Sequence, residues 1–258
     1  MSRRETLLVA HDGEQIGVEV CGEGPAVVLL HGSGGNRATW WQQVVDLARD
    51  FTVVTVEARG SGRSTDRADQ SGPVACTADL EAVRRELDLP TWHVVGHSLG
   101  GWTALRYAVT HPGTTSSAVI VSSVGGVFPP VVEARWEAFA SELAAKGWPA
   151  QALAESPSLR QRGTALAHLY QLVGSLNAQP SPTSPAARIR DFDLQDLSLL
   201  TMPVTFVCGA LDEIAPPRAV RAAAAAAGAG YAELAGAGHV PFWEAPEDFN
   251  ARLRALLA

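Results

Sequence analysis

Cysteine and lysine are scarce in this chain, and each scarcity excludes a kind of site. The three cysteines, Cys21, Cys76 and Cys208, are too few and too scattered to form a disulfide framework or a cysteine-based metal cluster. Lys146 is the only lysine, and we interpret this, with the abundant alanine, as a bias of composition. Cys208 lies in an apolar run and is expected to pack as a small hydrophobic side chain.

Excess basic charge and long apolar runs are also missing. The formal net charge of −7 at pH 7 argues against a nucleic-acid-binding protein. No run approaches the roughly 20 apolar residues of a membrane span. Near the N-terminus, Arg3 and Arg4 precede only a short apolar stretch at 7–10, which is too short for the core of a secretory signal. The sequence therefore predicts a cytoplasmic protein with neither nucleic acid nor a membrane as a partner.

Short apolar runs alternate with segments of helical periodicity along most of the chain. Strands are expected at residues 6–10, 15–21, 26–30, 51–56, 92–95, 118–122, 202–208 and 231–234. Helices are expected at residues 38–48, 76–89, 102–110, 216–227 and 246–257. This alternation is typical of an α/β protein with a mostly parallel central sheet and helices on both faces. In such sheets the functional loops gather at the carboxyl ends of the strands.

One stretch, residues 126–199, interrupts the alternation because it contains no convincing strand. Helices are expected at 130–147, 158–176 and 189–200, and the proline-rich segment 179–185 suits neither regular structure. We interpret the stretch as a helical cap, or lid, inserted into a core formed by residues 1–125 and 200–258. The alternative is a helical layer that lies away from the functional site. Its entry and exit at strand ends favour the cap.

The segment Gly96-His97-Ser98-Leu99-Gly100-Gly101 follows a predicted strand and precedes a predicted helix. A serine between glycines at such a junction fits a nucleophile elbow, in which a tight turn raises the hydroxyl above the backbone. Alone, the motif is equally compatible with an ordinary glycine-rich turn. Ser98 therefore becomes a candidate nucleophile only if the chain also supplies a base and an acid.

His239 and Asp212 are the candidate partners of Ser98. His239 lies in a glycine-rich loop after the last predicted strand, and Asp212 follows the strand before it. A carboxylate would hold the tautomer of the histidine and offset the charge that it acquires. Glu213 is an adjacent competitor, and a helix N-cap or a solvated loop acid is the alternative interpretation of Asp212.

Acyl transfer also needs hydrogen-bond donors for the oxyanion, each contributing about 3 kcal/mol. The candidates are the backbone amides of Leu99 and Ser33, with Gly34 as the alternative to Ser33. A group of apolar side chains suggests a small-to-medium, largely apolar substrate, although each is individually more typical of a core. The candidate substrate-pocket residues are Trp102, Phe128, Trp136, Phe139, Tyr170 and Val240.

The chain resembles the α/β-hydrolase fold superfamily over essentially its full length. The resemblance rests on the segments His31-Gly32-Ser33-Gly34-Gly35, Arg59-Gly60-Ser61-Gly62-Arg63-Ser64, Gly96 to Gly101, Gly209-Ala210-Leu211-Asp212 and Gly238-His239. The chain order serine, aspartate, histidine is also the order of that family. The resemblance implies a Ser-His-Asp triad, a two-amide oxyanion hole, no metal and no cofactor. One departure is Glu57, where relatives more often carry aspartate.

The leading hypothesis is hydrolysis of a small-molecule carboxylic ester or lactone through an acyl-enzyme. A serine nucleophile disfavours the haloalkane dehalogenase and epoxide hydrolase branches of the family, which use aspartate. The alternatives are carbon–carbon bond hydrolysis or a lyase or cyclase step on the same triad, and a ligand receptor that works by cap motion. The fold alone does not choose among them.

Overall fold

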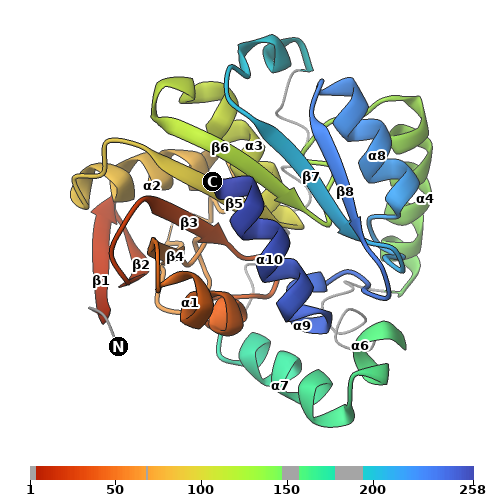
Figure 1. Ribbon diagram of the computed structural model, residues 1–258, viewed down its shortest axis with the longest axis horizontal. Coiled ribbons are helices and arrows are strands. Elements are labelled where there is room, and N and C mark those ends of the chain that lie inside the picture. Colours follow the sequence, from red (N-terminus) through yellow and green to blue (C-terminus); the bar gives the residue numbers. More distant parts are fainter. Residues whose placement is uncertain (1–3, 68, 147–156, 178–193) are drawn as a thin grey trace.

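A computed structural model of the chain describes residues 4–67, 69–146, 157–177 and 194–258. Its centre is one eight-stranded sheet with the strand order β1-β2-β4-β3-β5-β6-β7-β8 (Figure 1). The strands are β1 (Arg4–His11), β2 (Glu14–Cys21), β3 (Ala26–Leu30), β4 (Thr52–Val56), β5 (Trp92–His97), β6 (Thr115–Val121), β7 (Val204–Gly209) and β8 (Gly230–Leu234). The pairs β1/β2 and β2/β4 are antiparallel, and all the others are parallel. The predicted mostly parallel α/β sheet is confirmed.

Helices cover both faces of the sheet. The helices of the core are α1 (Trp41–Leu47), α2 (Pro73–Glu86), α3 (Leu99–Thr110), α8 (Pro217–Ala226), α9 (Pro241–Glu244) and α10 (Pro246–Leu257), with the 3₁₀ turns η1 (Arg37–Trp40) and η2 (Pro112–Thr114). Helices α2, α3 and α8 bury their apolar side chains in one core, and α1, α9 and α10 bury theirs in another. The sheet therefore separates two hydrophobic cores, the arrangement expected of helices on both faces.

Strand β3 shows why these apolar runs become central strands. Its side chains alternate in direction, so Val28 and Leu30 enter one core while Val27 and Leu29 enter the other. A strand that is buried on both faces has no polar side, which is why its sequence is continuously apolar. Edge strand β1 instead leaves most of its residues exposed.

Every regular element described between β6 and β7 is helical. These elements are α4 (Pro130–Lys146), α6 (Pro157–Gln161), α7 (Thr164–Ser175) and the turn η4 (Leu194–Leu199). Figure 1 shows α4 beside α8, and α6 and α7 next to α9, beyond the sheet. The proline-rich segment 179–185 and most of the helix expected at 189–200 lie outside the described residues. No helix in the described ranges is long and apolar enough to cross a membrane.

Most element boundaries lie a few residues from the predicted ones, and two larger differences have local reasons. The helix expected at 158–176 is two helices, because Gly163 between them has φ +124°, a conformation that no α-helix contains. The short helix α9 was not predicted, since four residues are too few to show a helical period. The turn that α9 adds follows His239 directly and helps to fix it.

Candidate active site

The elbow is a sharp junction between β5 and α3, and Ser98 sits at its apex with φ +50° and ψ −115°. Such a conformation costs a non-glycine residue about 1–3 kcal/mol and is typical of functional sites. Gly96 is required by packing, because a Cβ there would lie 2.1 Å from the backbone oxygen of Gly100. The two glycines therefore let the strand and the helix approach closely enough to form the turn.

Asp212 and His239 lie together, although 27 residues separate them in the sequence. The Nδ1 atom of His239 is 3.0 Å from both carboxylate oxygens of Asp212. Oxygen Oδ1 of Asp212 also accepts hydrogen bonds of 2.9 Å from the amides of Ile214 and Ala215. Both side chains are buried, while the competitor Glu213 is exposed. The pair therefore has the geometry of a carboxylate that orients an imidazole.

Two buried side chains fix the backbone around His239. The ring nitrogen Nε2 of His97 donates to the backbone oxygen of His239 at 2.9 Å. The carboxylate of Glu244 accepts hydrogen bonds from the amides of Gly238 and Val240, at 2.7 and 3.2 Å. Since His97 directly precedes Ser98, its hydrogen bond ties the His239 loop to the elbow. Burial lowers the pKa of His97 well below its ordinary value, so this donor is a neutral imidazole.

The Nε2 atom of His239 is buried and has no hydrogen-bond partner among the described residues, and Ser98 Oγ does not bond to it. In enzymes, a hydrogen bond between a nucleophile and its base is often long without a substrate and tightens when one binds. A buried polar atom without a partner is rare in folded proteins and calls for an explanation. Here the unpartnered atom is the one that a general base would use.

The loop after β3 lies directly against the elbow. A Cβ at Gly32 would come within 3.0 Å of Ser98 Cβ, so only glycine fits between the loop and the serine. Within the described part of the chain, the amides of Ser33 and Leu99 donate no hydrogen bond to the protein. The alternative donor, Gly34, has φ +73° in the turn that follows. Both predicted donors are therefore unused amides on the segments that meet at Ser98.

His31 holds the loop after β3 to the loop after β4. Its Nδ1 donates to the backbone oxygen of Gly32 at 2.7 Å, and its Nε2 accepts from the amide of Ala58 at 3.0 Å. These partners require the neutral tautomer with the proton on Nδ1. Burial lowers the pKa of His31, in keeping with that state.

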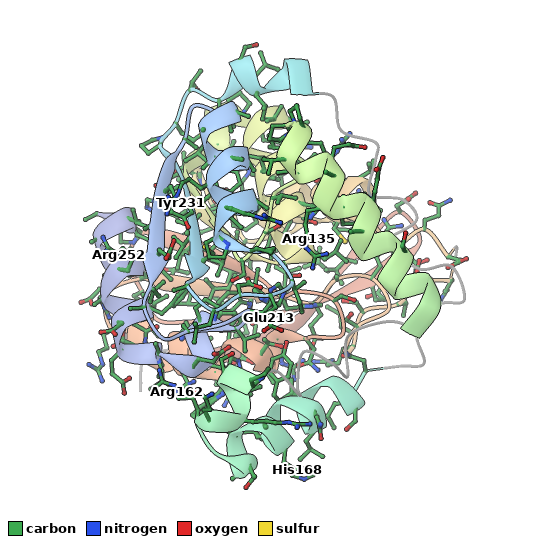
Figure 2. The ribbon with its side chains drawn as sticks, turned by 90° about the vertical axis from the view of Figure 1, so that its right-hand side faces the viewer. Arg135, Arg162, His168, Glu213, Tyr231 and Arg252 are labelled. Carbon is green, nitrogen blue, oxygen red and sulfur yellow. The ribbon has the colours of Figure 1, made fainter. Side chains whose placement is uncertain are left out.

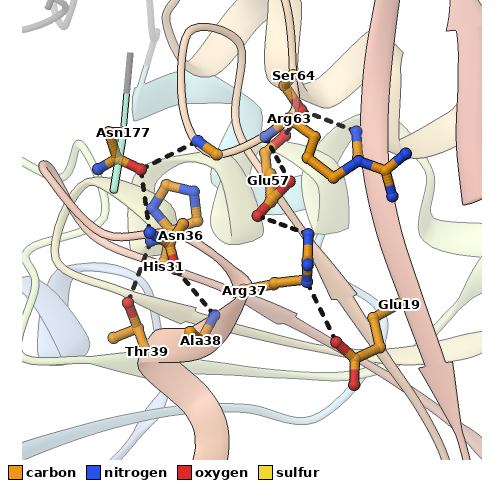
Figure 3. Close-up of polar contacts among 12 residues, drawn as sticks. Glu19, His31, Asn36, Arg37, Ala38, Thr39, Glu57, Arg63, Ser64 and Asn177 are labelled. Atoms are coloured by element: carbon orange, nitrogen blue, oxygen red, sulfur yellow. Dashed lines mark hydrogen bonds and ion pairs between the residues drawn. The ribbon is translucent and has the colours of Figure 1, made fainter. Parts of the chain in front are cut away.

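Glu57, the departure from the usual aspartate, organises the loop after β4 (Figure 3). Its carboxylate accepts from Arg37 Nη1 at 3.1 Å and from the amide of Arg63 at 2.8 Å. A Cβ at Gly62 would lie 2.1 Å from Glu57 Oε1, so the carboxylate fills the space under that turn. The longer acid thus has a structural part in shaping the loop beside Ser98.

Asn177, at the end of α7, joins these two loops (Figure 3). Its Nδ2 donates to the backbone oxygens of Gly34 and Gly35, at 2.7 and 3.1 Å. Its Oδ1 accepts from the amide of Gly62 at 3.0 Å and from Asn36 Nδ2 at 3.1 Å. One amide side chain therefore reaches both loops from the inserted segment.

Two arginines tie the same segment to the loops that carry Asp212 and His239 (Figure 2). Arg135 of α4 donates to the backbone oxygen of Glu213 at 3.0 Å. Arg162, after α6, donates to the backbone oxygen of Gly236 at 3.3 Å. With Asn177, the segment between β6 and β7 contacts the loops that carry Ser33, Asp212 and His239. It contacts the elbow as well, because Ser123 Oγ, just after β6, donates to the backbone oxygen of Ser98 at 2.7 Å.

Comparison with known proteins places this architecture in a family. Residues 27–252 match the model of the alpha/beta hydrolase family. The chain belongs to the alpha/beta hydrolase family. It is 32% identical over 256 residues to an uncharacterised protein of Mycobacterium tuberculosis, covering 89% of this chain and 74% of the relative. It is also 32% identical to a pimeloyl-[acyl-carrier protein] methyl ester esterase of Vibrio vulnificus, covering 90% and 94%.

A solved structure agrees with the family assignment at the level of the fold. The enol-lactonase from Burkholderia xenovorans superimposes with a TM-score of 0.79 at 22% identity, covering 97% of this chain and 99% of the lactonase. At that identity the likeness shows the shared fold alone. The alpha/beta hydrolase core predicted from the five motifs is therefore confirmed.

The predicted pocket residues of this alpha/beta hydrolase form two separate aromatic clusters. Trp102, Phe128 and Trp136 pack with ring centroids 5.4–5.8 Å apart under α4. Tyr170 packs edge-on against Trp243 at 5.1 Å, and Val240 is buried in the same core. The side chain of Phe139 lies outside the described residues. None of the other five lines the cavity that opens beside Ser33 and Leu99, and contact of any of the six with a substrate stays a prediction.

The roles of three residues at this site could not be predicted from motifs. Asn177 meets its partners across more than 110 residues of sequence and precedes a proline-rich segment that offers no pattern. His97 was recognised only as the neighbour of Ser98, although its tie to His239 follows from the adjacency of the two loops. Arg59 belongs to a matched motif, but only the structure shows that its guanidinium is buried.

Proposed function

We propose that this alpha/beta hydrolase cleaves a carboxylic ester or lactone, with Ser98 as nucleophile, His239 as general base and Asp212 as the residue that orients His239. The observation that carries the proposal is the buried His239–Asp212 pair at 3.0 Å, whose distal nitrogen Nε2 has no partner among the described residues. His97 ties the loop of this pair to the elbow, where Ser98 has φ +50°. The proposal that an ester or lactone bond is cleaved is also supported by two similar proteins, which are named as an esterase and an enol-lactonase.

The first half of the reaction forms an acyl-enzyme. Ser98 Oγ attacks the carbonyl carbon while His239 Nε2 takes its proton, and Asp212 offsets the imidazolium charge. The carbonyl oxygen becomes an oxyanion that the amides of Ser33 and Leu99 hold, beside the positive end of the α3 dipole. The tetrahedral intermediate then collapses, and His239 returns the proton to the departing alkoxide.

The second half releases the acid. A water molecule gives its proton to His239 Nε2 and attacks the acyl carbon, and the new intermediate expels Ser98, which recovers the proton from His239. The helical segment 126–199, which contacts the loops of Asp212 and His239 through Arg135 and Arg162, would act as a cap that shapes the substrate site. The Ser33 amide is proposed as the second oxyanion donor, with the amide of Gly34 as the alternative.

The proposal is tested with Ser98→Ala and short p-nitrophenyl esters. Turnover should fall to the background rate while thermal unfolding stays within a few degrees of the wild type. A fluorophosphonate probe should label the wild type at Ser98 and leave the variant unlabelled. Ser141→Ala is the matched control, because that serine is exposed on α4 and bonds only to the backbone of its own helix. Undiminished turnover in Ser98→Ala would sink the assignment.

A second assay of the wild-type protein distinguishes the proposed reaction from the alternatives. Wild-type protein is assayed with esters, lactones and vinylogous diketones at equal concentration. Hydrolysis of esters or lactones supports the proposal. Cleavage of the diketones alone points to carbon–carbon bond hydrolysis, and tight binding without turnover of any substrate points to a receptor.

A further inference from the structure

A cavity of about 90 Å³ lies between the candidate oxyanion donors and the start of α2. Ser33 and Leu99 line it, and so does Gly32, whose missing Cβ would lie 3.0 Å from Ser98 Cβ. A carbonyl carbon bonded to Ser98, with its oxygen on the two amides, therefore stands at the edge of this cavity. The acyl chain of the substrate can therefore extend into this cavity.

The size and walls of the cavity suit a short alkyl chain. At roughly 10–15 Å³ for each water-sized group, its volume holds about six to nine such groups. Leu30, Val56, Leu80 and Leu99 contribute apolar walls. Cys76 adds a neutral thiol, since burial raises its pKa to about 11. Apolar walls favour methylene groups over water.

One wall of the cavity carries an incompletely bonded guanidinium. Arg59 has a side chain only 1% exposed, and its Nε and Nη2 each donate to Asp79 at 2.8 Å. Its third nitrogen, Nη1, is buried and has no hydrogen-bond partner among the described residues. A buried donor left without an acceptor costs free energy, so a ligand oxygen that reached Nη1 would be favoured.

The charges around Arg59 decide what kind of oxygen fits. Asp79 already neutralises the guanidinium, and Asp12 lies 3.6 Å from its Nη2. Asp12 is 67% exposed, so water screens its charge, and Asp79 also bonds to His11 Nδ1 at 2.7 Å. The buried Arg59–Asp79 pair is therefore close to neutral, and a substrate carboxylate would lose its hydration there without a free counter-charge. A neutral acceptor, such as a ketone or a hydroxyl oxygen, takes the hydrogen bond without that penalty.

We propose that this cavity is the acyl-chain subsite, that it takes chains of about six to nine carbons, and that Arg59 Nη1 donates a hydrogen bond to a neutral oxygen on the chain. The substrate class is thus an ester or lactone of a medium-chain oxo or hydroxy acid. The inference rests on the proposed function, because it assumes an acyl group on Ser98.

The size of the subsite is tested by filling it. In Cys76→Leu, kcat/KM for p-nitrophenyl hexanoate should fall about tenfold, while the acetate ester, which is too short to reach residue 76, should change less than twofold. Val74→Leu is the matched control, because Val74 is two residues away on α2 but 42% exposed. An equal loss with both esters, or no loss with either, overturns the assignment. If Cys76→Leu does not fold, a wild-type rate that falls steadily from acetate to octanoate overturns it.

The oxygen acceptor is tested with three acyl groups of equal length. Wild-type kcat/KM should be about tenfold higher for the 5-oxohexanoate ester than for hexanoate, the gain expected of one hydrogen bond to a charged donor. The adipate half-ester, which ends in a carboxylate, should be the poorest of the three. Arg59→Lys should remove the preference for the oxo chain. Equal rates for the oxo and plain chains in the wild type overturn this part, whatever the fate of the variant.

Failure of the proposed function looks different. If Ser98→Ala still hydrolyses the acetate ester, or if the wild type hydrolyses no ester, the nucleophile or the reaction class is wrong. If the acetate ester is cleaved through Ser98 but chain length and chain oxygen have no effect, only the subsite is wrong.

Discussion

The two halves of the candidate site are held in place by different kinds of interaction. The acid–base half, with Asp212 and His239, is a small buried unit in an apolar, aromatic surrounding that includes Phe242 and Trp243. The oxyanion half consists of the loops after β3 and β4. It is held by a hydrogen-bond network in which side chains of Glu57, His31 and Asn177 bond to backbone groups. In the first half a hydrogen bond joins the two candidate catalytic side chains, while His97 and Glu244 fix the backbone beside it. In the second half the hydrogen bonds are spread over several side chains, and none of them joins two candidate catalytic groups.

The difference follows from what each half must do. A proton-transferring pair needs one fixed tautomer, and a single buried carboxylate with two backbone donors suffices for that. An oxyanion hole needs backbone amides that have no partner in the protein. The loops that carry these amides therefore lack the backbone hydrogen bonds that fix a strand or a helix. Side chains must supply the missing support. We therefore expect single substitutions to be severe in the first half and graded in the second.

The largest effect is expected from Asp212→Asn. The amide keeps an oxygen for the Ile214 and Ala215 amides but turns an NH₂ group toward His239 Nδ1, which favours the wrong tautomer. We expect kcat for a good ester to fall by about 10⁴ with little change in thermal stability. Glu213→Gln, one residue away and exposed, should stay within twofold of the wild type. An equal fall in kcat in the two variants would mean that Asp212 does not orient His239 during the reaction.

The next largest effect concerns stability in the oxyanion half. Asp79→Asn leaves the Arg59 guanidinium buried without its counter-charge, and such a loss costs about 3–5 kcal/mol of unfolding free energy. Urea denaturation of the variant and the wild type measures this loss of unfolding free energy. Asp12→Asn is the control, because Asp12 is 67% exposed and 3.6 Å from Arg59, so its loss should cost less than about 1 kcal/mol. Similar midpoints for the two variants would mean that the Arg59–Asp79 pair is not a buried ion pair in solution.

The two halves also differ in how far the sequence foretold them. Ser98, Asp212 and His239 could be proposed because each follows a strand, and parallel strands bring their carboxyl ends to one edge. The hydrogen-bond network of the oxyanion half could not be predicted. Asn177 and Glu57 bond to backbone groups, and a backbone group is the same in every residue type, so no sequence pattern marks it. The packing of Trp102 against Phe128 and Trp136 could not be foretold either. Periodicity places a residue on a helix face but does not say what that face meets.

A pH-dependent loss of stability should appear in both halves. Burial lowers the pKa of His31 and, further, that of His97 from 6.5, so below pH 6.5 the unfolded chain binds more protons than the folded one. Stability is therefore full above about pH 6.5 and falls as the pH drops, by up to about 1.4 kcal/mol per pH unit for each histidine.

Urea unfolding at pH 7.5, 6.5 and 5.5 measures this loss and sharpens the comparison. His97→Gln and His31→Gln should each flatten the profile, whatever their cost at pH 7.5. Because the pKa of His97 lies lower, its contribution should persist to a lower pH than that of His31. A wild-type stability that is constant from pH 7.5 to 5.5 would contradict the buried neutral state of both rings.

The smallest effect is expected from Asn177→Asp, which tests whether the inserted segment helps to position the oxyanion loop. A carboxylate keeps the acceptor for Gly62 and Asn36 but replaces the donor to the backbone oxygens of Gly34 and Gly35 with a repelling oxygen. We expect kcat to fall about fivefold, equivalent to about 1 kcal/mol, with KM nearly unchanged. The pH–rate profile should not move, because the His239–Asp212 pair is untouched. Ser175→Ala, on the same helix end and exposed, should be neutral. A shifted pH profile, or a rise in KM without a fall in kcat, would mean that Asn177 acts on the acid–base half or on substrate entry, and that the two halves are not mechanically separate.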